Sequence, residues 1–221
     1  MFDETIDKSY FNPIEGFKCL KAQWKYRYFP YDGVVSFCGE QGSGKSLSAF
    51  RLMARLKVLY PELTFVSNED LSGFTDYVEF ESYETIQNLN KKSIVLFLDE
   101  ICNMPNLTSL DSKSLPREWF SLLNMQRKRE LLIITTCPVF SRINKAFREQ
   151  IDTVVVCKKH GFIQHNRYCK IDYDKLLMAE SASDIMGGLM IVRNHWFFHS
   201  RKDYARFNTS ALIDNGKEKI I

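Results

Sequence analysis

The sequence contains little that would tie the chain to a membrane or to an oxidising compartment. No apolar run in its 221 residues approaches the roughly 18 residues that a membrane-spanning helix needs. The segment Met1–Glu4 lacks the basic start and apolar core of a signal peptide. The six cysteines include no C-x-x-C pair, which disfavours a disulfide framework and a zinc site. We therefore expect a cytoplasmic protein, in the host cell's cytoplasm if the chain is viral, with reduced cysteine thiols.

A strong charge of one sign is also missing. The chain has 30 Lys and Arg residues against 27 Asp and Glu residues, a net charge of +3, which permits nucleic-acid binding without requiring it. Two of the four histidines, His195 and His199, have i, i+4 spacing, but no Cys or acidic partner completes a metal set. There is no internal repeat and no low-complexity segment. A hydrophobic content of 45% is ordinary for a globular protein of one sizeable domain.

What the sequence does contain is a phosphate-binding motif. Residues 39–46 have the pattern G-x-x-x-x-G-K-S, known as the P-loop or Walker A motif, between an apolar run at 33–38 and helical spacing over 47–56. The glycines let successive backbone N–H groups face a phosphate at the positive end of the new helix. We predict that ATP contacts Gly39, Glu40, Gln41, Gly42, Ser43, Gly44, Lys45, Ser46 and Leu47.

Within this motif two side chains have their own predicted roles. Lys45 can reach the β- and γ-phosphate oxygens, and the Ser46 hydroxyl can ligate Mg²⁺. The alternative is a glycine-rich turn without a ligand. Such a turn has no need for a Lys-Ser pair after its last glycine, so we favour the ATP site.

A second motif supplies the other half of the predicted active site. The apolar run at 93–98 ends in Asp99 and Glu100, which is typical of a Walker B strand. We expect Asp99 to hold Mg²⁺ beside Ser46, and Glu100 to orient or deprotonate the attacking water. Hydrophobic strands often end in an acidic residue, so this interpretation depends on the pairing with the P-loop.

A cluster of three cations at residues 127–129, preceded by Gln126, comes before the apolar run at 131–136. ATPases that work as rings need an arginine to complete the neighbouring subunit's site, and we select Arg127 first, Arg129 second and Arg148 third. The alternative is that these cations only stabilise the C-terminal end of a helix dipole. Thr135 and Thr136, at the tip of the next strand, are candidate sensors of the γ-phosphate.

The spacing of apolar residues predicts how the chain is organised. Strand-like runs alternate with helical segments, which indicates parallel βαβ units and a doubly wound α/β sheet. The predicted strands are 33–38, 63–67, 93–98, 131–136 and 153–157, and the predicted helices are 47–56, 83–89, 117–129 and 140–150. The run 78–80 is not assigned to either class. From about residue 160 short strands, antiparallel and at the edge of the core, are expected at 162–163, 168–171 and 189–192.

We divide the chain into three parts. Residues 1–32 form an N-terminal arm, aromatic and basic, that packs on the sheet or on a neighbouring subunit, or stacks on nucleic acid. Residues 33–213 form the P-loop ATPase domain, with 160–213 as its accessory part. Residues 214–221 form a flexible tail.

Together these residues resemble the FtsK/HerA superfamily, most closely the Zot-type ATPases of phages and the genome-packaging ATPases of double-stranded DNA viruses. The resemblance rests on residues 39–46, 96–100 and 127–136, and extends to 138–148 and loosely to 204–209. It implies a RecA-like (ASCE) P-loop fold and a ring, pentamer or hexamer, that hydrolyses ATP with Mg²⁺ and translocates double-stranded DNA. A viral portal or capsid vertex is a further implied partner.

The chain departs from the family pattern at two points. The tip of the strand at 131–136 has Thr135-Thr136-Cys137 where the family usually has Thr-Gln, and no membrane helix follows the ATPase domain as it does in Zot-type proteins of filamentous phages. The leading hypothesis is therefore a packaging motor. Its candidate DNA contacts are the Lys and Arg residues within 112–117 together with Lys158, Lys159 and Arg167, although a solvated basic face explains these cations equally well.

Three alternatives stay open. One is the membrane-linked phage assembly ATPase of the same superfamily. Another is a small-molecule kinase, although such enzymes usually lack a Glu directly after the Walker B Asp. The third is a nucleotide-sensing module that binds ATP and turns it over negligibly.

Overall fold

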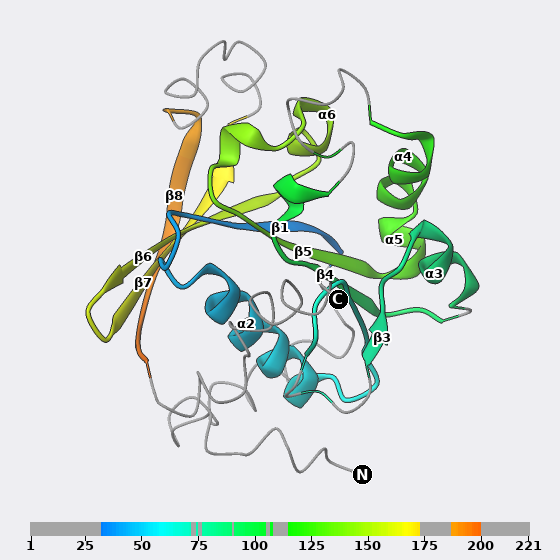
Figure 1. The fold of residues 1–221 in the computed structure, drawn as a ribbon, viewed down its shortest axis with the longest axis horizontal. Coiled ribbons are helices and arrows are strands. Elements are labelled where there is room, and N and C mark those ends of the chain that lie inside the picture. Colours follow the sequence, from blue (N-terminus) through cyan, green and yellow to red (C-terminus); the bar gives the residue numbers. More distant parts are fainter. Residues whose placement is uncertain are drawn as a thin grey trace, which may run out of the picture.

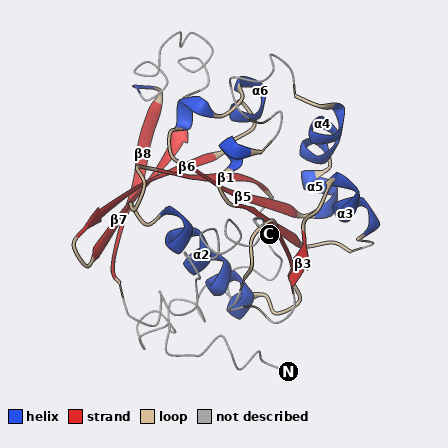
Figure 2. Cartoon of the chain, in the orientation of Figure 1, coloured by secondary structure: helices blue, strands red, loops and turns tan. Residues whose placement is uncertain are grey.

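The structure, a computed structural model, describes residues 32–71, 74, 77–89, 91–104, 107, 115–172 and 187–199. Within these ranges the chain forms one sheet of eight strands in the order β3-β2-β4-β5-β1-β6-β7-β8 (Figures 1 and 2). The strands are β1 (Gly33–Cys38), β2 (Thr64–Ser67), β3 (Tyr77–Glu79), β4 (Ile94–Leu98), β5 (Leu131–Cys137), β6 (Thr153–His160), β7 (Ile163–Ile171) and β8 (Leu189–Phe198). The helical elements are α2 (Lys45–Leu59), α3 (Tyr83–Asn88), η2 (Ile101–Asn103), α4 (Arg117–Asn124), α5 (Gln126–Arg129), η3 (Phe140–Arg142) and α6 (Lys145–Arg148).

Six of the strands, from β3 through β6 in the sheet order, are parallel. Every residue of β4 and β5 is buried, as expected for strands whose two faces are both covered. The prediction of a doubly wound, RecA-like α/β fold is therefore confirmed. Because the strands are parallel, β1, β4 and β5 all end at the same sheet edge, where the P-loop follows β1.

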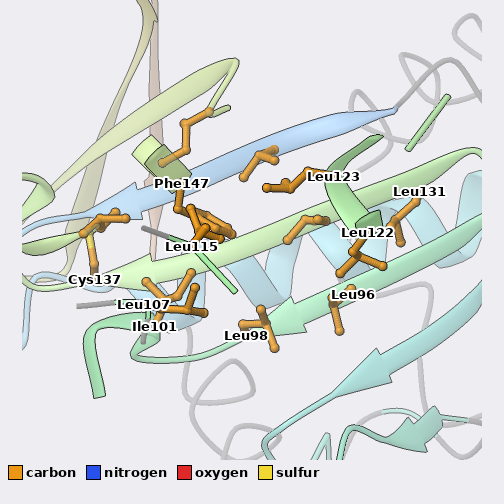
Figure 3. Packing of buried hydrophobic residues seen from close by; sticks show 14 of the residues in the cluster. Leu96, Leu98, Ile101, Leu107, Leu115, Leu122, Leu123, Leu131, Cys137 and Phe147 are labelled. Atoms are coloured by element: carbon orange, nitrogen blue, oxygen red, sulfur yellow. The ribbon is translucent and has the colours of Figure 1, made fainter. Parts of the chain in front are cut away.

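Helices cover both faces of this sheet (Figure 1). On one face, Phe50 and Met53 of α2 are fully buried and belong to the same apolar cluster as Phe97 of β4. On the other face, Leu96 of β4 belongs to a second cluster, with Leu122 of α4, Phe147 of α6 and the loop residues Leu107 and Leu115 (Figure 3). The alternation of side chains along β4 thus divides the core into two layers.

Two predicted helices are broken in the structure. The helix predicted at 117–129 is divided at Met125 into α4 and the short α5. The helix predicted at 140–150 is instead η3 and α6, because Ile143 is extended and Asn144 starts a new helix, its side chain accepting a hydrogen bond from the N–H of Ala146 at 2.9 Å. Such local capping competes with helix continuation and overrides the apolar spacing.

In the accessory part the edge strands are antiparallel, as expected, but they are longer than expected. β6 continues to His160, and β7 and β8, of 9 and 10 residues, extend the sheet as antiparallel strands. The spacing concealed β7 because Gln164 and Asn166 are polar yet buried. Their side chains bond to the P-loop region, as described below.

Several predictions fall on segments for which no structure is described. Apart from Asp32, the predicted N-terminal arm lies outside the described residues, as do residues 112–114, the segment 204–209 and the tail 214–221. The five cysteines within the described ranges are free thiols, and burial raises the pKa of Cys157 to about 12. None of the helices within those ranges is long and apolar enough to cross a bilayer.

Candidate nucleotide site

Two P-loop glycines have a positive φ and lie so close to other atoms that a side chain at either position would be strained. Gly44, just before α2, has φ 81° and ψ 27°, and a Cβ there would lie 2.2 Å from the Oε1 atom of Gln164. Gly39 has φ 155°, and a Cβ there would lie 2.6 Å from the carbonyl oxygen of Cys157. The loop is therefore shaped both by left-handed backbone and by close contact with β6 and β7.

The start of α2 fits an anion. Gly44 at the N-cap position has no side chain to cap the helix, and the first turn of α2 carries no acidic residue. The backbone N–H groups of this first turn are therefore available to a phosphate. Lys45 is buried and its Nζ donates a hydrogen bond to the carbonyl oxygen of Glu40 at 3.0 Å. Among the described residues, the buried Oγ of Ser43 has no hydrogen-bond partner. These are donors that a triphosphate would satisfy.

Asp99 is held by groups from three other segments of the chain. The Ser46 hydroxyl at the start of α2 donates to its carboxylate at 2.9 Å, and the Thr136 hydroxyl on β5 donates to the same oxygen at 2.6 Å. Asn68, just after β2, accepts from the Asp99 N–H at 2.8 Å and donates to the Asp99 carbonyl at 3.1 Å. The structure thus brings the Walker A serine and the Walker B aspartate together.

Asn68 was not among the predicted site residues. The sequence signal that could have found it is a polar residue directly after a short buried strand. In a parallel sheet such a residue lies at the edge where the P-loop lies. In the structure, the hydroxyl of Thr136 donates a hydrogen bond to the carboxylate of Asp99, and its role as a γ-phosphate sensor stays a prediction.

The site concentrates negative charge. Burial raises the pKa of Asp99, against the lowering effect of the hydroxyls of Thr136 and Ser46. Burial also raises the pKa of Glu69, and the charges of Asp99 and Glu100 raise it further. A hard cation with oxygen ligands would relieve this repulsion.

Mg²⁺ fits this site only with help from the nucleotide. Within the residues that the structure describes, no group of three or more His, Cys, Asp or Glu side chains is placed to hold a metal ion. Ser46 and Asp99 would hold Mg²⁺, and phosphate oxygens and water would complete its shell, which is how Mg²⁺ is usually bound.

Glu100 has an unusual backbone. Its φ of 49° and ψ of 51° are left-handed, which costs a residue with a Cβ about 1–2 kcal/mol. Its N–H donates to the Oγ1 of Thr136 at 2.8 Å, and its carboxylate accepts from the side chain of Asn103 at 2.6 Å. Strained residues that the surroundings hold in place are typical of functional sites.

Strand β7 supports the P-loop from behind. The Nε2 of Gln164 donates to the carbonyl oxygen of Ser43 at 2.8 Å and to the Oδ1 of Asn166 at 2.9 Å, and Asn166 also accepts from the Ser48 hydroxyl at 3.2 Å. The only sequence signal was that Gln164 and Asn166 are polar and two positions apart, a spacing that places them on one face of a strand. It predicted no partner, since the partner is far away in the sequence.

A cavity of about 480 Å³ lies beside the P-loop. Its walls combine the loop itself with apolar side chains from the segment after β5 and from β6, and with cations from β6 and β7. The lining residues outside the loop are Cys38, Pro138, Val139, Phe140, Val154, Val156, Cys157, Lys158, Lys159 and Arg167. Three of the predicted DNA contacts therefore adjoin the nucleotide site.

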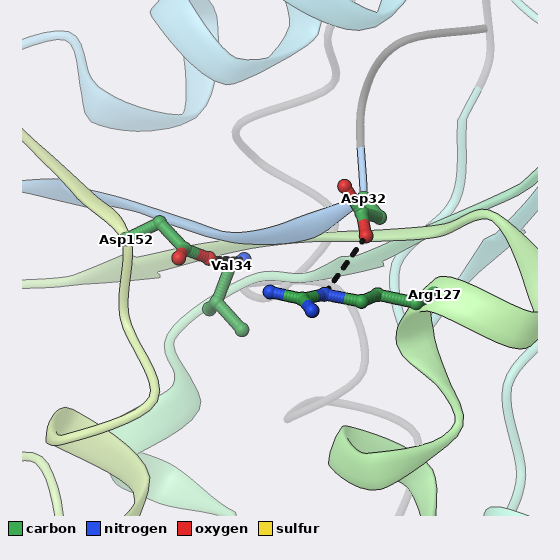
Figure 4. Close-up of polar contacts among 4 residues, drawn as sticks. All are labelled: Asp32, Val34, Arg127 and Asp152. Carbon is green, nitrogen blue, oxygen red and sulfur yellow. Dashed lines mark hydrogen bonds and ion pairs between the residues drawn. The ribbon is translucent and has the colours of Figure 1, made fainter.

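Two of the predicted arginines, Arg127 and Arg129, lie at the opposite edge of the sheet. Both precede β5, whereas the P-loop follows the end of β1, which is parallel to β5. The side chain of Arg127 is 94% exposed, and its Nε lies 3.8 Å from Asp32 Oδ2, near Asp152, which accepts the N–H of Val34 at 2.8 Å (Figure 4). The structure does not bring either arginine to its own P-loop.

Arg129 and Arg148 have bonds within the chain. Arg129 donates to the carbonyl oxygens of Ile86 at 2.5 Å and Leu89 at 3.4 Å, at the end of α3. Arg148 is buried and donates to the carbonyl oxygen of Ser141 at 3.0 Å, and burial lowers its pKa. Arg127 is thus the most available of the three to a neighbouring molecule.

The fold and the strand–loop–helix geometry define a P-loop NTPase of the RecA-like class. The N-terminal domain of zonular occludens toxin from Neisseria meningitidis has the same fold, with a TM-score of 0.59 and 14% sequence identity over 80% of this chain and 98% of that one. Two further similar structures are the genome-packaging NTPase B204 from Sulfolobus turreted icosahedral virus 2 and the DNA-packaging ATPase B204 from Sulfolobus turreted icosahedral virus. The first has a TM-score of 0.45 and 16% sequence identity over 58% of this chain and 76% of that one. The second has a TM-score of 0.44 and 13% sequence identity over 58% of this chain and 77% of that one. No family model and no curated protein matches the chain.

Proposed function

We propose that this protein is a Mg²⁺-dependent ATPase that moves DNA, acting as a subunit of a ring in viral genome packaging. The main support for ATPase activity is the direct hydrogen bond between Ser46 and Asp99, next to which the backbone of Glu100 is held by Thr136. A Walker A serine and a Walker B carboxylate that meet in this way are placed to share one Mg²⁺. The bound ion would neutralise phosphate charge and polarise the phosphoryl group.

The chain's own residues would perform the rest of the reaction. Lys45 would exchange its bond to the Glu40 carbonyl for the β- and γ-phosphate oxygens. Glu100 would accept a proton from water as the water oxygen bonds to the γ-phosphorus and the bond from that phosphorus to the leaving oxygen of ADP breaks. Thr136 donates a hydrogen bond to the Asp99 carboxylate and accepts one from the Glu100 N–H, so it would fix the positions of these two residues relative to each other. The cavity beside the P-loop would receive the nucleoside.

The ring and the DNA belong to the same proposal. Arg127 would act on the nucleotide of the neighbouring subunit, which requires an exposed side chain away from its own P-loop, and its 94% exposure is consistent with that role. Double-stranded DNA would be contacted through phosphates by cations such as Lys158 and Arg167. A portal or capsid vertex would be the docking partner.

The experiment that tests the proposal is steady-state ATP hydrolysis with and without double-stranded DNA, in wild type and in Glu100→Gln. We expect DNA to raise the turnover, and the substitution to lower it at least about a hundredfold, the lower limit for a lost general base, with nucleotide binding preserved. Glu118→Gln, on the exposed surface of α4, is the matched control and should hydrolyse ATP like wild type. Turnover that ignores DNA, or that survives in Glu100→Gln, would contradict the proposal.

A second candidate, a Zot-type phage assembly ATPase that works with a membrane partner, draws support from the shared fold of the zonular occludens toxin domain. This candidate predicts the same ATP hydrolysis, but with a turnover that is raised by a membrane partner and not by DNA. Turnover raised by a membrane partner and unaffected by duplex DNA would favour it. Phosphorylation of a small molecule in place of hydrolysis would favour a kinase.

A further inference from the structure

The antiparallel extension of the sheet carries rows of aromatic and basic side chains on one face. Lys158, His165 and Trp196 are directly paired across β6, β7 and β8, so their side chains point to the same side. The next row toward the tip pairs His160, Ile163 and Phe198 in the same way. These residues lie on the side of the sheet opposite to Gln164 and Asn166, which alternate with them along β7.

The aromatic rings of this face are stacked and open to solvent. The rings of His165 and Trp196 are nearly parallel, with 3.7 Å between centroids and 4° between planes, and His160 stacks on Trp196 at 6.0 Å. At the tip, Phe162 stacks on Phe198 at 6.0 Å. Trp196 is 55% exposed, and the two phenylalanines are 67% and 68% exposed. We call these five residues the stacking face.

Charge on the three strands is of one sign. The sequences of β6, β7 and β8 contain Lys158, Lys159, Arg167, Lys170 and Arg193, and no Asp or Glu among their described residues. The whole chain, by contrast, has nearly as many acidic as basic residues. A flat aromatic stack bordered by cations is complementary to a polyanion with exposed planar groups.

We propose that the stacking face binds single-stranded nucleic acid, with bases on Trp196 and its neighbours and phosphates at Lys158 and Arg167. Proteins that bind single strands without sequence preference combine aromatic platforms with a positive groove. A duplex cannot use such a platform because its bases are stacked on one another. A second copy of this face would bring cation against cation. The inference rests on the proposed DNA-directed ATPase and adds a separate site on the same chain for an unpaired stretch of nucleic acid.

The two faces of β7 connect this surface to the nucleotide site. On one face Gln164 bonds to the P-loop at Ser43. On the other, Arg167 and, across the strand pair, Lys158 line the cavity beside the P-loop and continue into the stacking face. A nucleic-acid strand bound to the stacking face would therefore lie next to β7, the β-strand that holds the P-loop in place.

The test measures binding of fluorescein-labelled oligo(dT) and of a duplex of equal length to the full chain, by anisotropy without ATP. Wild type should bind oligo(dT) more tightly than the duplex. Trp196→Ala should weaken oligo(dT) binding about tenfold, the loss of one stacked base, and Trp196→Phe should restore most of it. Phe120→Ala, an exposed aromatic residue on α4, is the matched control and should bind like wild type.

A second arm measures the phosphate contact. Lys158→Ala should reduce the slope of log affinity against log salt by about 0.7 for a single strand, whereas the exposed Lys91→Ala should not. Phe198→Ala repeats the stacking test if Trp196→Ala fails to fold. The inference is overturned if wild type does not bind oligo(dT), if Trp196→Ala binds it as wild type does, or if the substitution changes only the sedimentation coefficient, which would identify a self-interface.

The Glu100→Gln variant separates the two proposals. If that variant loses turnover while Trp196→Ala retains oligo(dT) affinity, the ATPase stands and the stacking face does not bind nucleic acid. If Glu100→Gln keeps its turnover while Trp196→Ala loses affinity, the hydrolysis mechanism fails and the binding surface stands.

Discussion

Asp99 is a buried carboxylate whose environment favours the protonated form. Its folded-state pKa lies above the ordinary 3.8 because burial outweighs the hydroxyls that donate to it. The folded chain therefore binds this proton more tightly than the unfolded chain does. It follows that the ionised group lowers the stability of the metal-free protein, and that this penalty grows as the pH rises from about 3.8 through the folded-state pKa.

We predict that Asp99→Asn raises the thermal stability of the nucleotide-free protein near neutral pH, and that the gain disappears as the pH falls below the folded-state pKa. The same variant should lose the stabilisation by Mg²⁺ and ATP, which in wild type is about 2.7 kcal/mol at a hundredfold the Kd. Thermal unfolding across pH, with and without Mg²⁺ and ATP, measures both effects.

Exposed Glu62→Gln is the control for this substitution and should change neither quantity. If Asp99→Asn is less stable than wild type at neutral pH without ligand, the hydrogen bonds from Ser46 and Thr136 outweigh the burial of charge. If it keeps the Mg²⁺ effect, Asp99 is not the metal ligand.

At the scale of elements, β7 holds the P-loop in place. Gly44 meets Gln164 so closely that a Cβ would lie 2.2 Å from its Oε1, and Gln164 is itself fixed by bonds to Ser43, Asn166 and His199. Gly161, in the turn between β6 and β7, has a similar left-handed φ of 60° but open space around it. The two glycines thus differ in contact rather than in backbone.

We predict that Gly44→Ala destabilises the protein more than Gly161→Ala. Backbone strain should cost both variants about 1 kcal/mol, and the clash should add about 1–3 kcal/mol only at Gly44. Urea denaturation gives both free energies of unfolding. In the Gly44→Ala, Gln164→Ala double variant the two losses should not add. Equal losses in the two single variants would mean that β7 does not constrain the loop.

At the scale of the whole molecule, the question is whether active sites are shared. Arg127 and Lys45 lie at opposite edges of one sheet, so an exposed arginine can serve only a site on another copy of the chain. Arg129 differs, since its bonds to the end of α3 make it part of the fold of its own subunit.

We predict that Arg127→Ala and Lys45→Ala chains, each inactive alone, recover part of the wild-type turnover when mixed. The mixture contains sites with Lys45 from one chain and Arg127 from the other. Steady-state hydrolysis against mixing ratio measures the recovery. Mixing Lys45→Ala with Glu100→Gln is the control, because both residues act within one site.

Arg127→Ala should unfold like wild type, since exposed ion pairs contribute less than about 1 kcal/mol, whereas Arg129→Ala should be less stable by about 1.5–3 kcal/mol. Full activity of Arg127→Ala alone would exclude the shared arginine.

The sequence by itself determined most of the parallel part of the sheet and the identity of the nucleotide motifs. Buried parallel strands are continuous apolar runs, and a phosphate loop needs its glycines, Lys45 and Ser46 next to one another in the chain, so both signals are local. Asp99 could be predicted for the same reason, since it directly follows such a run.

The tertiary structure alone decided which residues support these motifs. The site includes Asn68, directly after β2, Thr136 of β5 and Gln164 of β7. Their roles depend on contacts between residues that are 31 to 121 positions apart in the sequence. The stacking face depends on strand register in the same way, because His165 and Trp196 become neighbours only when β7 pairs with β8. Local patterns encode the elements, whereas side-chain partners far apart in the chain are set by packing and register, which no local pattern contains.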